Sequence, residues 1–278
     1  MWKTNQLFHA NLVRLSRSVV FWICNVSILV YTVVYMLNGC RQRKNGLVTS
    51  YFLEDFYFQF AILIGLFAAV FTTLYLSVEY GNGVLRNKII VGHTRADIYL
   101  SNLLLGFFAS VIMMGIGLAG GLVGIPTFGT WNMGGLQVLL RILIMVMFLF
   151  AFCAVFTMLC MLIQNKSICA IVTVLAYFAL LVASSMMINR LMQPEMVSDT
   201  ILTAQGVTFS EPKPNPLYLE GFWRKVLDFI IDLIPAGQGI RLSSNDIGHP
   251  VRMLALSTFV TVFFTAFGLF MFNKKDLK

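Results

Sequence analysis

The sequence predicts an all-α, polytopic membrane protein with six transmembrane helices. Of its 278 residues, 58% are hydrophobic and only 12% are charged, and the mean hydropathy is +0.82, far above that of an average water-soluble domain. Six windows of roughly 20 apolar residues are each long enough to cross a hydrocarbon core about 30 Å thick as a helix. The windows lack the strict alternation of a membrane strand, so we do not expect a β-barrel.

The predicted spans contain few polar groups. None of the 12 acidic residues falls inside a window, whereas ion-driven carriers usually place ionisable groups near the bilayer midplane. Proton-coupled transport is therefore disfavoured. Arg141, near the outer end of the fourth span, is expected to extend its guanidinium to the headgroups, and Asn25 is expected to bond a neighbouring helix. The spans are 19 to 38, 58 to 78, 99 to 122, 138 to 161, 168 to 189 and 252 to 272.

The N-terminal segment, residues 1–18, precedes the first span. Trp2, Phe8, Leu12 and Leu15 recur at near-helical spacing among basic residues, a pattern typical of an amphipathic helix lying at the membrane interface. A solvated leader remains the alternative. The segment is too long and too mixed for a signal peptide.

The distribution of basic residues predicts that both termini are cytoplasmic. With that orientation ten Lys and Arg lie inside and four lie near the outer ends of the spans, although the basic cluster at 41 to 44 argues mildly against it. The net charge of +8 is then explained by lipid headgroups, and we expect no binding of nucleic acid. The ten inner residues are Lys3, Arg14, Arg17, Arg86, Lys88, Arg95, Lys166, Lys274, Lys275 and Lys278.

The sequence offers no recognisable catalytic or metal-binding motif. The three histidines are scattered, and Gly81-Asn82-Gly83 lacks the spacing and the Lys of a phosphate-binding loop. The five cysteines form no paired motif and are interpreted as small buried hydrophobic residues. We therefore expect neither an enzyme nor a bound cofactor or metal, and a partner would have to supply any energy. The cysteines are Cys24, Cys40, Cys153, Cys160 and Cys169.

The third span carries glycines four residues apart, Gly117 with Gly121 and Gly120 with Gly124. Such small-residue spacing lets two helices approach closely, so we expect these glycines to serve helix packing.

Residues 79–98 form the longest predicted cytoplasmic connection. Gly81 and Gly83 end the second span, Val84 to Val91 predicts a short amphipathic helix, and Gly92 ends that helix. Thr94 and Asp97 have the spacing of a capping box that starts the third span. The short helix can dock on a soluble partner or rest on lipid headgroups, and its composition alone is compatible with both alternatives.

The pattern E-Y-x-x-G-x-L-R-N-K-x-x-x-G-x-x-R-x-x-I-Y-L-S, from Glu79 to Ser101, resembles the cytoplasmic loop of ABC type-2 exporter permeases. The similarity continues with D-L-I-P-A-G-Q, from Asp232 to Gln238, and with K-K-D-L, from Lys274 to Leu277. It covers essentially the whole chain as a single transmembrane domain, residues 1–278, with six spans and a long loop before the sixth.

This resemblance implies a permease subunit in the cytoplasmic membrane of a bacterium. It would pair with a second copy or a homologous permease and dock on two separate ABC ATPase subunits, which bind ATP and Mg²⁺. In this family the loop between spans two and three holds a coupling helix seated on the ATPase. Glu79 and Arg95 would brace the loop at its two ends. Carried over to this chain, the contact residues are Arg86, Asn87, Lys88, Ile89 and Ile90.

Family members line their pathway chiefly with the second and fifth spans. In the second span Phe60, Phe67, Phe71 and Leu74 share one helical face. This face is the candidate pathway lining for an amphiphilic substrate such as a peptide, an antibiotic or a lipid. Ordinary helix packing is the alternative that the residues favour.

Residues 190–251 form a long outer loop, rich in proline from 211 to 216 and then helical in pattern from Phe222 to Leu233. Arg224 and Asp228 have the spacing of an ion pair on that helix, and Pro235 ends it. The resemblance suggests an outer gate that includes Pro235, Gly237 and Gln238, and anchoring at the lipid surface is the alternative.

Two other functional classes remain open. A membrane sensor or scaffold without transport activity could use the same basic loop to hold a cytosolic partner, and co-purification of an ATPase would distinguish an exporter from it. An intramembrane enzyme would need a cluster of nucleophile, base or metal ligands that the sequence does not show.

Overall fold

The structure is a computed structural model that describes residues 10–47, 51–81, 83–129, 131–198, 200–203 and 206–275. About 80% of the described residues are helical, and they include six helices that are long and apolar enough to span a membrane. The predicted multi-pass, predominantly helical fold is therefore confirmed. The spans are formed by α2 (Val19–Lys44), α3 (Glu54–Tyr57) with α4 (Ala61–Gly81), α6 (Arg95–Gly121) with η1 (Leu122–Gly124) and α7 (Ile125–Phe128), α8 (Gly135–Leu162), α9 (Lys166–Leu191) and α12 (Pro250–Lys274).

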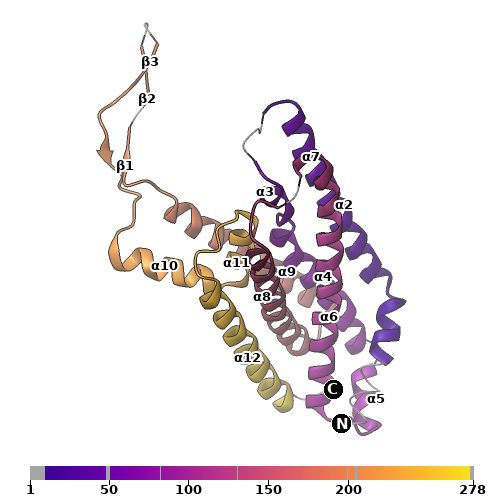
Figure 1. Ribbon diagram of the computed structural model, residues 1–278. Helices are drawn as coiled ribbons and strands as arrows, with labels where there is room; N and C mark the ends of the chain where they lie inside the picture. The colour runs from indigo at the N-terminus through magenta and orange to yellow at the C-terminus, as the bar shows by residue number, and fades with distance from the viewer. Residues whose placement is uncertain are drawn as a thin grey trace.

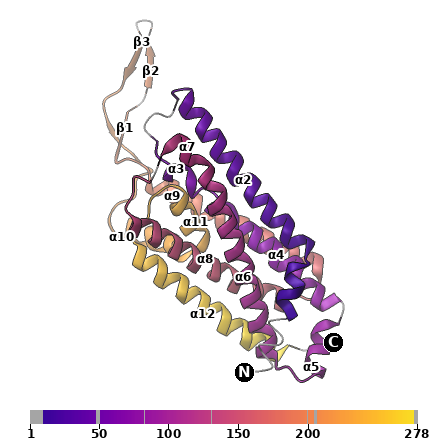
Figure 2. The ribbon, with the colours of Figure 1, turned by 45° about the vertical axis from the view of Figure 1, so that its right-hand side comes forward.

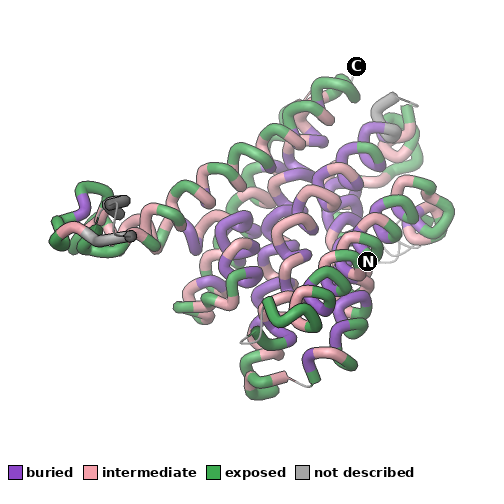
Figure 3. Tube along the Cα trace, turned by 90° about the horizontal axis from the view of Figure 1, so that it is seen from above, coloured by how far each residue is buried: buried purple, intermediate pink, exposed green. Residues whose placement is uncertain are grey.

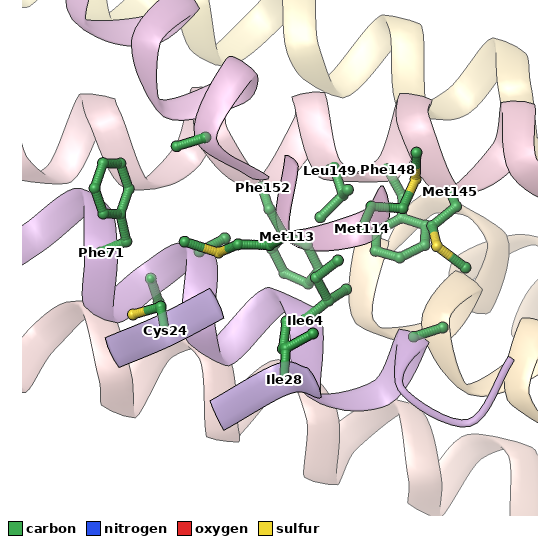
Figure 4. Packing of buried hydrophobic residues seen from close by; sticks show 14 of the residues in the cluster. Cys24, Ile28, Ile64, Phe71, Met113, Met114, Met145, Phe148, Leu149 and Phe152 are labelled. Carbon is green, nitrogen blue, oxygen red and sulfur yellow. The ribbon is translucent and has the colours of Figure 1, made fainter. Parts of the chain in front are cut away.

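The long helices lie side by side in one bundle (Figure 1). Helix α8 is central, because it packs against α4, α6 and α12. Around its midpoint Phe148 and Phe152 meet Ile64 of α4 and Met113 of α6, all of them at most 1% exposed (Figure 4). Exposed residues lie on the outer sides of the peripheral helices (Figure 3), as expected for helices whose apolar faces meet lipid.

Several helices extend beyond the predicted windows, and local caps fix the first residues of α2 and α9. Ser18 accepts a hydrogen bond from the Phe21 amide and starts α2, and Asn165 caps α9 in the same way. The second span begins at Glu54, which is only 6% exposed. The expectation that no carboxylate belongs to a span is therefore wrong at the span ends, because Asp97 also lies in the first turn of the third span.

The glycines of the third span serve close packing, as predicted. A Cβ added to Gly117 would lie 2.7 Å from the Phe60 ring, and one added to Gly121 would lie equally close to the Tyr57 ring. The Tyr57 hydroxyl donates to the carbonyl of Leu118 at 2.6 Å. Aromatic side chains of α3 and of the turn between α3 and α4 therefore occupy the space that these glycines leave open.

Two predicted polar contacts are wrong. Asn25 donates to the carbonyl of Phe21 at 2.8 Å, one turn earlier in its own helix, and not to a neighbouring helix. Arg141 does not reach towards headgroups, because it is 5% exposed and donates to the side chain of Asn245 at 3.0 Å and to its carbonyl at 3.1 Å. The chain just after α11 brings these acceptors to the end of α8, so the guanidinium is enclosed.

The segment before α10 contains strands that the sequence analysis did not predict. Strands β2 (Thr200–Thr203) and β3 (Gly206–Phe209) form an antiparallel pair, and so do β1 (Met196–Val197) and β4 (Lys213–Pro214). The β2–β3 pair projects from the bundle at the end opposite to α5 (Val84–Ile90) (Figures 1 and 2). Each strand is only two to four residues long, too short for a periodic signal.

Helices α10 (Gly221–Leu233) and α11 (Pro235–Ser243) follow the strands. The predicted end of α10 before Pro235 is confirmed, and the same proline also occupies the first turn of α11. Most of α11 is buried against α4, α8 and α9. A Cβ at Gly239 would lie 2.8 Å from the Ala61 carbonyl oxygen, so the glycine permits this close approach.

Residues 10–16 of the N-terminal segment are helical, and residues 1–9 of the predicted interfacial helix lie outside the described part of the chain. Leu15 is 3% exposed, and the Arg14 guanidinium donates to the carbonyl of Tyr75 at 3.3 Å. The described part of this helix therefore packs on α4.

Candidate functional site

Helix α5 occupies the predicted cytoplasmic loop between α4 and α6, one residue shorter than expected. Gly83 precedes it with φ +64° and Gly92 follows it with φ +94°, values that favour glycine. The amide of Asn87 donates to the Gly83 carbonyl at 3.0 Å, and the amide of Gly92 donates to the Ile89 carbonyl at 2.9 Å. The predicted glycine boundaries are therefore confirmed.

One face of α5 is fixed to α6. Leu85 is 3% exposed and Ile98 is fully buried, and Ile89 packs against both. The predicted capping box forms next to this contact, because the Asp97 amide donates to the Thr94 hydroxyl at 3.1 Å and the Thr94 amide donates to the Asp97 carboxylate at 3.2 Å. The short helix therefore has a defined position on α6.

The opposite face of α5 carries basic, amide and apolar groups. Arg86 and Asn87 are exposed, and Ile90 and Val91 are 74% and 73% exposed. Lys88 is partly buried. Ile89, which we expected to make contacts with a partner, lies on the inner side against Leu85. Val91 was missed, although it follows Asn87 by one helical turn and so shares its face.

Arg95 joins the loop to the end of the last span. Its Nη1 lies 2.9 Å from the carbonyl oxygens of both Phe272 and Asn273, and 2.5 Å from that of Lys275. These carbonyls belong to the C-terminal end of α12, where a cation satisfies free acceptors and the helix dipole. The predicted brace with Glu79 lies outside the described side chains, so it stays a prediction.

The candidate pathway lining of the second span is mostly enclosed within this chain. Phe60 and Phe71 are each 1% exposed, Phe67 is partly buried and Leu74 is 42% exposed. The Phe71 ring packs edge-on against Phe21 of α2, with ring centroids 6.0 Å apart. In this conformation two of the four side chains serve helix packing, the alternative that the sequence favoured.

The three predicted gate residues lie in α11, where they join α10 to the bundle. Pro235, Gly237 and Gln238 are all buried. The Gln238 side-chain amide donates to the carbonyls of Asp232 at 2.5 Å and Met253 at 3.1 Å, and its oxygen accepts from the Ser257 hydroxyl at 2.8 Å. Gln238 is therefore a cross-link between α10, α11 and α12.

A charged cluster lies beside this cross-link. Asp228 and Asp232 of α10 both pair with Arg241 of α11 and with Arg252 of α12. The sequence spacing predicts an ion pair between Asp228 and Arg224. In the structure Asp228 pairs with Arg241 and Arg252 instead. Arg224 instead donates to the Leu191 carbonyl at 2.9 Å.

The two carboxylates of this cluster have different environments. Asp232 is fully buried, and burial raises the pKa of its carboxyl above the ordinary value in spite of the Arg241 guanidinium. Asp228 is 25% exposed. Burial alone would raise the pKa of Asp228, but hydrogen bonds from Arg252 and Arg241 outweigh it and hold that pKa below its ordinary value.

Among the described residues there is no group of three or more His, Cys, Asp or Glu side chains that could hold a metal ion. The geometry instead provides a fixed helix with one exposed face at one end of the bundle, and a helix pair held by an ion-pair cluster near the other (Figure 2). Comparison with protein-family models and with curated proteins finds no match to this chain.

Proposed function

We propose that this chain is the membrane subunit of an ATP-driven exporter of the ABC type-2 kind, in the cytoplasmic membrane of a bacterium. Two ABC ATPase subunits, which bind ATP and Mg²⁺, dock on α5 of this chain and of a second permease. The single observation that carries the proposal is the exposed face of α5, where Ile90 and Val91 lie beside Arg86. An apolar centre with a polar and basic rim is typical of a protein-binding surface.

The attachment of α5 supports a coupling role. Its inner residues Leu85 and Ile89 pack on Ile98 of α6, and its start follows α4 directly. A displacement of α5 by an ATPase therefore moves the ends of two spans, which is the type of helix shift that a power stroke requires. The substrate that we propose is an amphiphilic compound, such as a peptide, an antibiotic or a lipid, carried outward.

The test is a double substitution on the exposed face, Arg86→Asp with Ile90→Asp. Both side chains point away from α6, so the variant is expected to insert and fold normally while it loses the ATPase in co-purification and loses ATP-dependent export. Ile89 is left unchanged because it belongs to the packed face. The matched control is Lys166→Asp, which reverses an exposed charge at the same end of the bundle without touching α5.

The outcomes separate the functional classes. Loss of the ATPase in the double variant but not in Lys166→Asp supports the exporter. Full retention of ATPase binding and export in the double variant contradicts the docking surface. If the wild-type chain co-purifies with a cytosolic protein that hydrolyses no nucleotide, it is a sensor or scaffold and the exporter proposal is wrong.

A further inference from the structure

Two cysteines that are nine residues apart in the sequence meet where α8 ends and α9 begins. Cys160 lies in the last turn of α8 and Cys169 in the first turn and a half of α9. Their sulfur atoms are 3.3 Å apart, and the Cys169 thiol donates towards the Cys160 sulfur. Each side chain is only 1% exposed.

The surroundings of this pair are polar for a membrane protein. The Cys160 thiol donates to the Thr73 hydroxyl of α4 at 3.6 Å, and the Thr173 hydroxyl lies 3.9 Å from the Cys169 sulfur. Cys153, only two turns before Cys160, has a serine hydroxyl as its neighbour and not a second thiol. Packing alone would be served by any small apolar residue, so it does not explain two adjoining thiols with hydroxyl partners.

One basic side chain lies near Cys169 at this end of the bundle. Cys169 follows the Asn165 cap of α9 by four residues, and its amide donates to the Asn165 carbonyl at 2.9 Å. Lys275 lies close by, because its ammonium donates to the carbonyls of Met161 and Leu162 at 3.0 Å. Burial lowers the pKa of the Lys275 ammonium, and negative charge on Cys169 opposes that shift.

We propose that Cys160 and Cys169 form a redox-active dithiol, which a peroxide converts into a disulfide that joins α8 to α9. The Cys169 thiolate attacks one peroxide oxygen and becomes a sulfenic acid, and the second oxygen leaves as water after protonation. The Cys160 sulfur then attacks the sulfenic sulfur, and a second water leaves. Two thiols and one hydrogen peroxide thus give one disulfide and two waters, and a cellular thiol restores the dithiol.

The geometry requires only a local movement. The sulfurs must approach from 3.3 Å to the bond length of about 2.05 Å, and they lie at the end of the bundle, beside the short connection between two helices. The bond would tie α8 to α9 next to Thr73, in the second half of the helix that leads into α5. Control of export by this bond rests on the proposed function, whereas formation of the bond does not.

The experiment counts free thiols in the purified full chain. After treatment with hydrogen peroxide, quenching and unfolding in the presence of a maleimide, the wild type is expected to lose two of its five reactive thiols. Proteolysis without reductant should yield a linked peptide pair containing Cys160 and Cys169, and dithiothreitol should separate it. Oxidation of added glutathione in the same tube checks the oxidant.

Substitutions assign the bond. Cys160→Ala and Cys169→Ala should each keep all of their remaining thiols after peroxide, or lose one without forming an internal link. The matched control Cys24→Ala removes another buried cysteine, and this variant should still lose two reactive thiols after peroxide treatment. Wild-type protein that keeps five thiols while glutathione is oxidised overturns the proposal, and so does a link between any other two cysteines.

This readout is independent of transport. If the α5 substitutions show that no ATPase is bound, the thiol count still decides the dithiol proposal. If the ATPase does bind, ATP-dependent export measured with and without peroxide shows whether the disulfide regulates it, with Cys169→Ala as the insensitive control.

Discussion

Asp232 offers the sharpest test of how α10 is attached to α11 and α12. Its carboxylate is fully buried, 2.5 Å from the Arg252 guanidinium and 3.3 Å from that of Arg241. We choose Asp232→Ala as the perturbation because it removes the charge and leaves both arginines in place. Arg241 is itself 6% exposed, so water cannot replace the lost partner there.

The magnitude follows from the partners that remain. Removal of one partner from a buried ion pair costs about 3 to 5 kcal/mol, because the other charge stays buried without compensation. Here Asp228 still pairs with both arginines, and Arg252 is 28% exposed. We therefore expect Asp232→Ala to lower the free energy of unfolding by about 2 to 3 kcal/mol, at or below the lower end of that range. At roughly 2 to 4 °C per kcal/mol, the apparent Tm should fall by about 4 to 12 °C.

The assay is thermal unfolding of the detergent-solubilised chain with a thiol-reactive dye. All five cysteines are buried, so the dye reports the loss of packing. Two variants bracket the result. Asp232→Asn keeps the shape of the side chain, so its Tm should fall by less than the Tm of Asp232→Ala. Glu220→Gln changes an exposed carboxylate whose side chain makes no capping bond, and its Tm should stay within about 1 °C of wild type.

One result would refute this reasoning. If Asp232→Ala melts within about 1 °C of wild type while Glu220→Gln behaves as expected, the attraction between the buried charges only balances their desolvation. The helix pair would then be held by packing and by Gln238, and the charged cluster would contribute nothing measurable.

Two further predictions concern Asp228 and Gly117. The pKa of Asp228 is held below its ordinary value of 3.8, so its stabilisation is present above that pH and is lost as pH falls through the lower pKa of the folded state. The Tm difference between wild type and Asp228→Asn should therefore shrink below about pH 4, whereas an unchanged difference at acid pH contradicts the pairing. Gly117→Ala places a methyl group 2.7 Å from the buried Phe60 ring and should destabilise by about 1 to 3 kcal/mol in the same melting assay. Gly115→Ala, two residues away with open space around its Cβ, is the control, and equal effects would refute the packing role.

The local signals in the sequence were sufficient for α5 and its boundaries. Gly83, Gly92 and the Thr94–Asp97 capping box act over a few residues, so their pattern determines the backbone whatever the rest of the chain does. The exposed face of α5 was predicted only in part. Ile89 and Ile90 have the same chemistry, and only the position of Ile98 on α6 decides which of them is covered.

The contacts that sequence reasoning missed join residues far apart in the chain. Arg95 bonds carbonyls 177 to 180 residues later, and Arg141 bonds Asn245 across 104 residues. The partner in each case is a backbone group or an amide, which leaves no charge pattern to recognise. The Cys160–Cys169 pair was missed for another reason, because its spacing matches no motif and becomes a contact only when α8 and α9 pack antiparallel.

The end of the bundle that carries α5 is connected by basic side chains at helix C-termini. Arg95 at the start of α6 binds the end of α12, Lys275 after α12 binds the end of α8, and Arg14 binds the last turns of α4. At the ends of α12 and α8 the cation satisfies free carbonyls and needs no buried acid, so these two links avoid the desolvation of a second charge. In the proposed exporter, a force on α5 would pass through Ile98 to α6, and then through Arg95 and Lys275 to α12 and α8. A disulfide between Cys160 and Cys169 would extend that connected set to α9, which is why this position, and no other cysteine in the described part of the chain, is suited to change how the end of the bundle moves.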